Sequence, residues 1–226
     1  MTKTIDFGDL KCGCAVAKSD TVTYLLYPLD EMNDSIGRIS AQCGVTVVSV
    51  CGMQWDDDLT PWPSAGVPAG SAPFKGHAPA FLERLRREVI PGVEQGLGIT
   101  PSRRDIVGVS LSGLFAMWQW AICDLFDNMA TLSGSFWYDG FVSWLEKNFT
   151  RTTSGRIFML LGDLESKSKV PEFSTVGVCT DEVVRILGEH GMKVHFEMVP
   201  GNHYQNALPR LEKAMQWLYM TGSSAE

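Results

Sequence analysis

The sequence predicts a three-layer α/β domain, with a mostly parallel sheet covered by helices on both faces. Apolar strand-type runs alternate with helical patterns from residue 22 to residue 220, and this alternation is typical of βαβ units. The runs at residues 22–27 and 45–50 are continuously apolar or β-branched, which suits strands buried on both faces. The chain has 226 residues and no internal repeat. We therefore expect one domain, residues 1–226.

The predicted strands are short apolar runs. Residues 22–27 (VTYLLY) form the first of them, and Pro28 ends it. Residues 45–50 (VTVVSV) are rich in the β-branched side chains that favour strands. The remaining strands are expected over residues 105–109, 128–132, 156–161 and 193–199. The carboxyl ends of parallel strands share one edge of a sheet, and ligands bind there. Candidate residues should therefore follow these strands directly.

Helical patterns separate the predicted strands. The clearest is at residues 78–96, where apolar side chains recur on one side. The predicted helices cover residues 32–43, 78–96, 114–123, 141–148, 180–190 and 204–220. Gly191 ends the helix that precedes it. Residues 55–72 are rich in Asp, Pro, Gly and Ser, so we expect a long loop there, and we expect residues 221–226 to form a frayed tail.

The composition excludes several classes of partner. Hydrophobic residues make up 45% and charged residues 20% of the chain, as in ordinary soluble globular proteins. A net charge of −7 argues against nucleic acid as the main partner. No run approaches the ~20 apolar residues of a membrane span, and residues 1–18 hold no signal-peptide core. We therefore expect no membrane anchor and a cytoplasmic location. The six cysteines form no Cys-x-x-Cys pair, so we expect buried, reduced thiols and no metal site.

The most informative segment is residues 108–113 (GVSLSG), where an apolar strand-type run becomes helical. This pattern is typical of a nucleophile elbow, in which a serine on a strained strand-to-helix turn projects from the sheet. Ser110 is therefore the candidate nucleophile. Gly108 and Ser112 lie where the helix crosses close to the strand, so both residues must be small. Ser112 replaces the glycine that is usual at this position.

A serine hydroxyl needs a base to take its proton, and that base is commonly histidine. In the chain order typical of nucleophile elbows, the histidine comes last. Among the four histidines, His203 lies in the tight loop PGNHY after the last predicted strand. His195 falls inside a strand, His190 at the end of a helix and His77 at the start of one. His203 is therefore the predicted base.

An acidic residue after the preceding strand should orient the imidazole. Residues 158–165 (FMLLGDLE) offer two carboxylates. We favour Glu165, because a Gly-x-x-acidic spacing places it on the turn, and Asp163 is the alternative. An oxyanion hole needs two backbone N–H groups. We expect one from Leu111, the residue after the nucleophile, and the other from the loop at residues 27–32.

Four segments carry a resemblance to a known family: WDDDLTPWP at residues 55–63, GVSLSGLFA at 108–116, LSGSFW at 132–137 and PGNHY at 200–204. Together they resemble an esterase family of the α/β-hydrolases. Its members include enterochelin (catecholate siderophore) esterases, S-formylglutathione hydrolase, feruloyl esterases and the mycolyltransferase antigens. The resemblance extends from about residue 24 to residue 218 and is greatest to the single-domain, siderophore-esterase-like branch.

The resemblance implies an α/β-hydrolase fold, with the nucleophile at Ser110 and the base at His203. The family's Leu-Asp-Gly-x oxyanion loop falls on residues 29–32, which implies the Met32 amide as the second donor. In this chain Glu replaces the usual Gly of that loop. Some relatives use little or no acid, so a Ser–His dyad is an alternative to the triad. Residues 133–154 are too few for a large lid domain, so we expect an open pocket.

These features predict a serine ester hydrolase that works through an acyl-enzyme, without a metal or an organic cofactor. We expect a small or medium ester, with aromatic and catecholate esters as candidates. The predicted substrate contacts are Trp55, Trp62, Phe136 and Trp137, for which core packing is the alternative role. The rival functions are a non-catalytic binding protein of the same fold and acyl transfer to an acceptor other than water.

Overall fold

The structure, a computed structural model, describes residues 2–27 and 32–220, without the side chains of residues 32–34 and 220. Eight strands of these residues form one sheet in the order β1-β2-β4-β3-β5-β6-β7-β8. The strands are β1 (Thr2–Phe7), β2 (Leu10–Ala15), β3 (Thr21–Leu26), β4 (Thr46–Cys51), β5 (Arg103–Val109), β6 (Asn128–Leu132), β7 (Ile157–Gly162) and β8 (Val194–Val199). β3 to β8 pair in parallel with one another, which confirms the predicted sheet.

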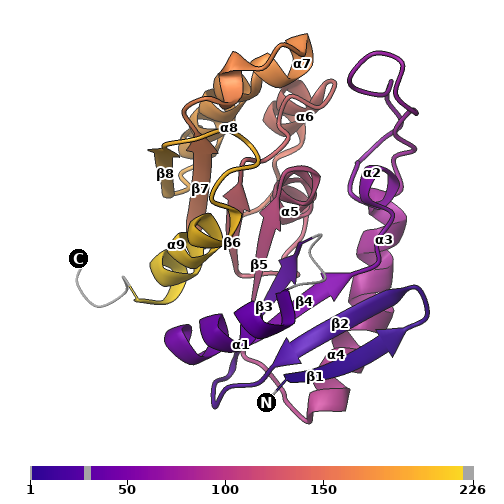
Figure 1. Ribbon diagram of the computed structural model, residues 1–226, viewed down its shortest axis with the longest axis vertical. Helices are drawn as coiled ribbons and strands as arrows, with labels where there is room; N and C mark the ends of the chain where they lie inside the picture. The colour runs from indigo at the N-terminus through magenta and orange to yellow at the C-terminus, as the bar shows by residue number, and fades with distance from the viewer. Residues whose placement is uncertain (1, 28–31, 221–226) are drawn as a thin grey trace.

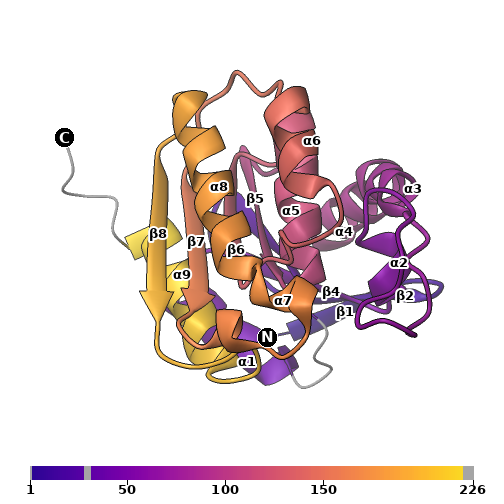
Figure 2. The ribbon, with the colours of Figure 1, turned by 90° about the horizontal axis from the view of Figure 1, so that it is seen from above.

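Helices cover both faces of this sheet, as predicted for three layers (Figure 1). They are α1 (Met32–Cys43), α2 (Trp55–Asp58), α3 (Ala78–Arg84), α4 (Ile90–Leu97), α5 (Leu111–Ile122), α6 (Phe141–Asn148), α7 (Pro171–Ser174), α8 (Val176–Glu189) and α9 (Ala207–Met220). α1 and α9 lie together on one face, and α5, α6 and α8 lie on the other (Figure 2). The stretch between β6 and β7 carries only the short helix α6 in place of a large lid.

Each face of the sheet has its own hydrophobic core. Along β5, Ile106 packs into one core and Val107 into the other, as the alternation of side chains in a strand requires. Leu211 and Met215 of α9 pack on the Val107 side. On the opposite side, every residue of α5 except Ile122 is buried. The central residues of β5 and nearly all of α5, which flank Ser110, are therefore buried in the two cores.

β1 and β2 form a hairpin that adds two antiparallel strands to those predicted. The chain turns at Gly8, which has φ = 72°, and β2 then pairs with β4. Leu10, Cys12 and Cys14 alternate into the core, so this strand carries a two-residue period in which cysteines act as small apolar side chains. All six cysteines are unpaired. Only Cys12 and Cys14 are buried, whereas the prediction was that all six would be.

Helix boundaries differ from the prediction in several places. α5 begins at Leu111 instead of residue 114, because Ser110 itself caps the helix. The predicted loop at residues 55–72 contains the short helix α2. The predicted helix at 78–96 is observed as α3 and α4, joined by a π-helical turn at Leu85–Val89. α7 is an additional helix, α8 begins before the predicted residue 180, and α9 begins after the predicted residue 204. The predicted frayed tail lies outside the described residues.

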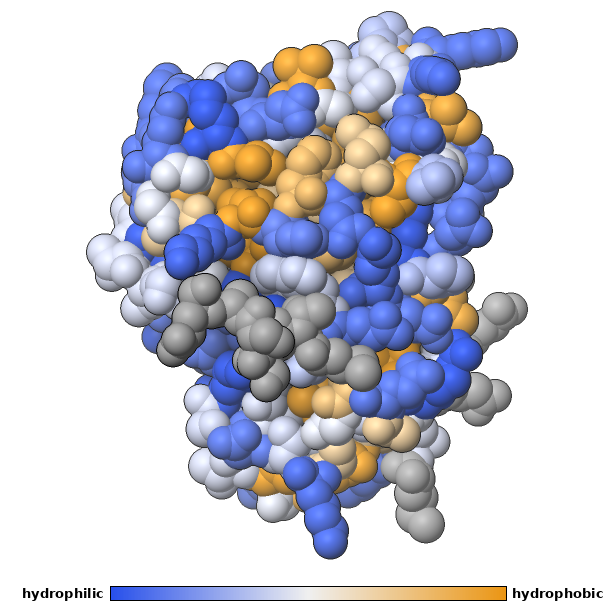
Figure 3. All heavy atoms as spheres, turned by 90° about the vertical axis from the view of Figure 1, so that its left-hand side faces the viewer, coloured by the Kyte–Doolittle hydropathy of each residue, from blue (hydrophilic) through white to orange (hydrophobic). Residues whose placement is uncertain are grey.

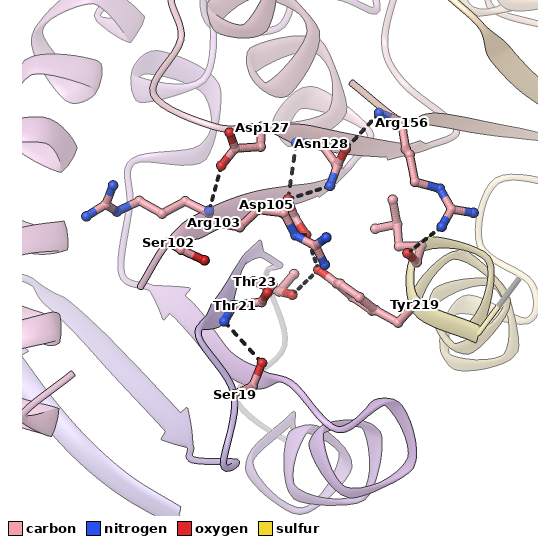
Figure 4. A network of polar contacts seen from close by, with 12 residues as sticks. Ser19, Thr21, Thr23, Ser102, Arg103, Asp105, Asp127, Asn128, Arg156 and Tyr219 are labelled. Carbon is pink, nitrogen blue, oxygen red and sulfur yellow. Dashed lines mark hydrogen bonds and ion pairs between the residues drawn. The ribbon is translucent and has the colours of Figure 1, made fainter. Parts of the chain in front are cut away.

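A buried polar network fixes the far end of α9 (Figure 4). The Tyr219 hydroxyl donates to Asp105 Oδ2 at 2.6 Å and lies 2.6 Å from Thr23 Oγ1. The Asn128 side-chain amide and backbone N–H donate to Asp105 Oδ1 at 2.9 and 3.1 Å. Asp105, Thr23 and Asn128 all lie near the amino ends of their strands. The network therefore joins α9 to β3, β5 and β6 at the edge of the sheet opposite Ser110.

The last strand, β8, forms an open edge of the sheet. Figure 3 shows the molecule from this side, where hydrophobic surface lies among hydrophilic residues. The large apolar side chains exposed on the described surface include Met198 of β8 and Val178 of α8, with Leu164 and Tyr204 at the mouth of a pocket. No helix within residues 2–27 and 32–220 is long and apolar enough to cross a membrane.

Candidate active site

Ser110 occupies the sharp turn between β5 and α5. Its backbone has φ = 55° and ψ = −122°, a strained conformation for a residue with a side chain. The turn is held by the Ser110 N–H, which donates to the Leu132 carbonyl at 3.0 Å. A Cβ on Gly108 would overlap the backbone of Ser112, so only glycine allows this crossing. The local geometry is that of a nucleophile elbow, and it directs the Ser110 hydroxyl into a pocket.

Ser112 stands where this elbow usually has glycine, and its hydroxyl is fully used. It accepts the Val109 N–H at 2.7 Å and donates to the Leu26 carbonyl at 2.6 Å or the Val109 carbonyl at 2.8 Å. Ser112 is completely buried, so these bonds satisfy a group that would otherwise be costly to bury. The serine therefore ties the elbow to the end of β3.

His203 reaches Ser110 from the loop that follows β8. Its Nε2 lies 3.1 Å from Ser110 Oγ. Gly201, with φ = 113°, turns the chain in this loop, and its N–H donates to Asp163 Oδ1 at 2.9 Å. The other histidines lie elsewhere: His195 pairs with Glu197 on β8 at 2.9 Å, and His77 and His190 flank helices.

Glu165 lies behind the imidazole, in the 3₁₀ turn Glu165–Lys167 that follows β7. Its Oε2 lies 2.8 Å from His203 Nδ1. Its Oε1 accepts from Ser133 Oγ at 2.6 Å and from the Gly162 N–H at 2.7 Å. The side chain is buried, and burial by itself raises a carboxyl pKa. The hydrogen bonds from His203, Ser133 and Gly162 outweigh burial, so the pKa of Glu165 is below its ordinary value.

Asp163, the alternative acid, has a different contact. It is exposed, and its carboxylate accepts the Gly201 N–H instead of a proton from the imidazole. Its own N–H donates to the Val199 carbonyl at 2.9 Å. Asp163 therefore joins the loop after β7 to the loop that carries His203. The structure brings Glu165, and not Asp163, to the imidazole.

The predicted oxyanion donors lie at two helix starts. Leu111 is the first residue of α5, so its N–H has no acceptor within the helix, and Leu111 also lines the pocket. Met32 is the first residue of α1, but residues 29–31 of the implied oxyanion loop lie outside the described residues. The positive end of the α5 dipole adds to the attraction for a developing negative charge beside Ser110.

The pocket over Ser110 and His203 has a volume of about 800 Å³. Trp55 and Trp137, two of the four predicted substrate contacts, line it. Trp62 and Phe136 are not among its lining residues, which corrects their predicted role. The Trp62 indole donates to the Asp139 carbonyl at 2.9 Å, and Phe136 is buried and stacks on Phe141 with ring centroids 5.7 Å apart. Phe136 is part of the core, and Trp62 is partly buried and packs against it.

Several residues of the site lacked a role in the sequence-based prediction. Phe173 of α7 packs against Trp137 with ring centroids 4.8 Å apart and lines the pocket. Ser135 Oγ lies 3.3 Å from Ser110 Oγ. Ser133 and Arg210 both contact Glu165. Ser133 and Ser135 come just after β6. Residues that follow parallel strands meet at the carboxyl ends of the sheet, and this rule could have indicated both serines. For Arg210, the one indication in the sequence is that a charged residue lies on the apolar face of α9.

The arrangement can activate a serine hydroxyl. His203 can take the Ser110 proton at Nε2, and Glu165 at Nδ1 can hold the imidazole in the required tautomer. The described residues include no group of three or more His, Cys, Asp or Glu side chains placed to hold a metal ion. The structure therefore brings a serine hydroxyl, an imidazole, a buried carboxylate and helix-terminal N–H groups together at the carboxyl ends of the parallel strands.

Solved structures with the same architecture include several hydrolases. An IroE-like serine hydrolase from Shewanella oneidensis matches with a TM-score of 0.78 and 19% identity, over 97% of this chain and 80% of that one. The siderophore hydrolase EstA from Aspergillus nidulans matches with a TM-score of 0.75 and 16% identity, over 99% and 95%. A ferulic acid esterase matches with a TM-score of 0.65 and 16% identity, over 97% of each chain. The protein therefore has the α/β-hydrolase fold.

In sequence, the chain is similar to the uncharacterized protein YbbA of Bacillus subtilis (strain 168). The two are 27% identical over 173 residues, which cover 72% of this chain and 68% of that protein. No protein-family model matches the chain. Because a shared fold does not imply a shared reaction, the function has to be argued from the site itself.

Proposed function

We propose that this protein is a serine ester hydrolase. The observation that carries the proposal is the continuous contact from Ser110 Oγ to His203 Nε2 (3.1 Å) and from His203 Nδ1 to Glu165 Oε2 (2.8 Å), at the base of an open pocket. A buried acid, a base and a strained serine in this order have few purely structural uses. The hydrolase and esterase names of the solved structures with this fold support the same proposal.

The reaction proceeds through an acyl-enzyme. Ser110 Oγ bonds to the ester carbonyl carbon while His203 Nε2 takes its proton, and the Leu111 and Met32 amides hold the oxyanion. The carbon–oxygen bond to the alcohol then breaks, and His203 gives its proton to the departing oxygen. Water repeats the sequence and releases the acid. Glu165 stays ionised throughout and stabilises the imidazolium in each half-reaction.

The pocket favours an ester with an aromatic group. Trp55, Phe74, Trp137 and Phe173 supply aromatic surface around Ser110, on which a planar acyl or alcohol group can pack. The names of the relatives, siderophore hydrolase and ferulic acid esterase, lead us to include catecholate and feruloyl esters among the candidates. Simple aryl esters of small acids complete the series.

Labelling with a fluorophosphonate probe tests the proposed nucleophile. We expect one covalent adduct per chain, on the peptide that contains Ser110, and no adduct in Ser110→Ala. A panel of acetyl, feruloyl and catecholate esters then identifies the preferred acyl group. Labelling of another serine, or unchanged turnover in Ser110→Ala, would contradict the proposal. Absence of both labelling and turnover would favour a non-catalytic binding protein, and ester products of added alcohols would favour acyl transfer.

Charge at the pocket decides between neutral and anionic substrates. Lys167 and Asp56 both line the pocket, whereas Lys169 does not. If an anionic ferric catecholate is the substrate, Lys167→Ala should raise its KM, and the neighbouring variant Lys169→Ala serves as the matched control. An equal or higher kcat/KM on simple aryl esters, unchanged by Lys167→Ala, would leave a general carboxylesterase.

A further inference from the structure

The feature that the proposed mechanism leaves unused is a buried guanidinium behind the acid. Arg210, in the first turn of α9, is 5% exposed. Its Nη1 donates to Glu165 Oε1 at 3.1 Å and to Ser133 Oγ at 3.1 Å. Ser133 in turn donates to the same Oε1 at 2.6 Å. Glu165 therefore lies between two basic groups, with His203 on one oxygen and Arg210 on the other.

Arg210 forms a different set of contacts from Arg151, the other buried arginine in the described part of the chain. Its Nε and Nη2 are buried and have no hydrogen-bond partner in the described part of the chain. Arg151 is buried to a similar extent, but its three nitrogens donate to the backbone carbonyls of Trp120, Cys123, Asp127 and Thr153. Burying an arginine is costly unless its charge is compensated. The described contacts of Arg210 compensate that charge only through the carboxylate that holds His203.

We propose that Arg210 is a positioning residue, which shares the Glu165 carboxylate with His203 and thereby limits how strongly that carboxylate favours the protonated imidazole. This inference rests on the proposed function, because it concerns the base of that mechanism. The guanidinium and the Ser133 hydroxyl stabilise negative charge on Oε1 and so reduce it on Oε2. Oε2 can then orient the imidazole while stabilising the imidazolium less strongly. A base that stays protonated cannot take the Ser110 proton.

Other charged and titratable groups face this pair from the neighbouring elements, and all of them remain in the variants below. They are Tyr27 at the end of β3, Asp56 in α2, Asp163 and Lys167 around the acid turn, and Tyr204 beside the imidazole. Burial raises the pKa of Tyr27, so it is neutral at working pH. Arg210 is therefore the cation in direct contact with Glu165 on the side away from His203.

An NMR titration of the histidine side chains tests the proposal without any substrate. The chain has four histidines, and comparison with His203→Gln assigns the His203 signal. In Arg210→Gln, which keeps a donor but removes the charge, the titration midpoint of His203 should rise by about one pH unit, because the imidazolium then faces an uncompensated carboxylate. Arg210→Met should behave in the same way, and Arg210→Lys should restore the native midpoint.

Arg151→Met is the matched control, because it also removes a buried guanidinium but should leave the midpoint unchanged. If the His203 midpoint is the same in the native chain, Arg210→Gln and Arg210→Met, the proposal is wrong. It is also wrong if Arg151→Met produces the same shift. Should the native chain cleave no ester while the midpoint moves as expected, the charge sharing stands and the proposed function fails. With an active ester, the acidic limb of kcat/KM should move in parallel with the midpoint.

Discussion

Two buried carboxyl groups lie at opposite ends of the parallel strands, and their pKa values are shifted in opposite directions. Glu165 follows the carboxyl end of β7, and Asp105 lies near the amino end of β5, where Figure 4 shows it. Burial raises the pKa of Asp105, and the hydrogen bond from Tyr219, the charge of Arg103 and the hydrogen bonds from Asn128 offset this only in part. Burial acts on Glu165 too, but its hydrogen bonds lower the pKa overall. The hydrogen bonds to the carboxyl group therefore outweigh burial at Glu165, where chemistry is proposed, and do not outweigh it at Asp105.

Helix α9 contacts both carboxyl groups, one at each of its ends. Arg210 in the first turn of α9 contacts Glu165, and Tyr219 at the other end of α9 contacts Asp105. Leu211, Ala214 and Met215 between them pack on the sheet. We therefore expect the two ends of the strands to contribute to different properties of the protein. Changes at the carboxyl edge should mainly affect turnover, and changes at the amino edge should mainly affect the free energy of unfolding.

The largest expected effect is at Ser110 and His203. Ser110→Ala or His203→Ala should lower kcat on the preferred ester by about 10⁴-fold or more, because a nucleophile and its base act as a unit. His195→Ala is the control, since His195 pairs with Glu197 on β8, and it should retain nearly full activity. Steady-state kinetics on purified, folded variants measure the difference. Retained turnover in His203→Ala would remove the base assignment.

Glu165→Gln should lower kcat by roughly 10²- to 10⁴-fold, because the amide cannot stabilise the imidazolium. Asp105→Asn should leave kcat within about twofold, since it lies at the far edge of the sheet and changes no contact of the catalytic groups. Asp163→Asn should be mild as well, because Asp163 contacts the Gly201 N–H. A loss in Asp163→Asn as large as that in Glu165→Gln would overturn the choice of acid.

Substitutions at the amino ends of the strands should change the free energy of unfolding. Asp105→Ala should lower the free energy of unfolding by about 2–4 kcal/mol, because it leaves the buried Asn128 donors without their acceptor, Arg103 without its carboxylate partner and the Tyr219 hydroxyl with Thr23 Oγ1 alone. Tyr219→Phe should cost about 1 kcal/mol, the typical net value of one hydrogen bond. Urea denaturation measures both. Glu88→Ala, which breaks an exposed pair with Arg84, is the control and should change stability by less than about 0.5 kcal/mol.

The smallest expected effect concerns how stability depends on pH, because Asp105 and Glu165 should contribute with opposite signs. The raised pKa of Asp105 means that its ionised form opposes folding, so its cost is present above the folded-state pKa and is relieved as the pH falls toward the unfolded value of 3.8. The lowered pKa of Glu165 means that its stabilisation is present above the unfolded value of 4.5 and is lost as the pH falls through the folded-state pKa. The two carboxylates therefore contribute slopes of opposite sign.

Urea denaturation at about pH 4.5 and about pH 3, an interval in which ordinary histidines are already protonated and do not contribute, tests these signs. On acidification, the native chain should gain stability relative to Asp105→Asn and lose stability relative to Glu165→Gln. The two variants control for each other, since each replaces one carboxyl by an isosteric amide. The free energy of unfolding of the native chain minus that of each variant is the quantity to follow. If it changes in the same direction for both variants, the expected opposite signs are wrong.

Local patterns in the sequence predicted a large part of this protein. The parallel strands β3 to β8 and the helices between them follow from hydrophobic period and length, and β6 and α6 have the predicted bounds. The sharp turn at Ser110 could be predicted because the small residues that it requires are adjacent in the chain. The sequence analysis missed β1 and β2, whose inward positions include Cys12 and Cys14 and give a weak apolar signal.

The choice among side chains that meet in space required the tertiary structure. Asp163 and Glu165 follow the same strand, and the Gly201 amide and the His203 imidazole each contact one of them. Trp62 and Trp137 are both aromatic, but only Trp137 faces the pocket. Such choices depend on the packing of segments far apart in the chain.

The sequence by itself therefore determined the layered sheet, the elbow at Ser110 and the loop position of His203, because each depends on neighbouring residues or on one hydrophobic period. Only the tertiary structure decided that Arg210 meets Glu165, across 45 residues of chain, and that Tyr219 meets Asp105, across 114. No local pattern encodes these pairs. They arise because the packing of α9 on the sheet brings both of its ends to buried carboxylates.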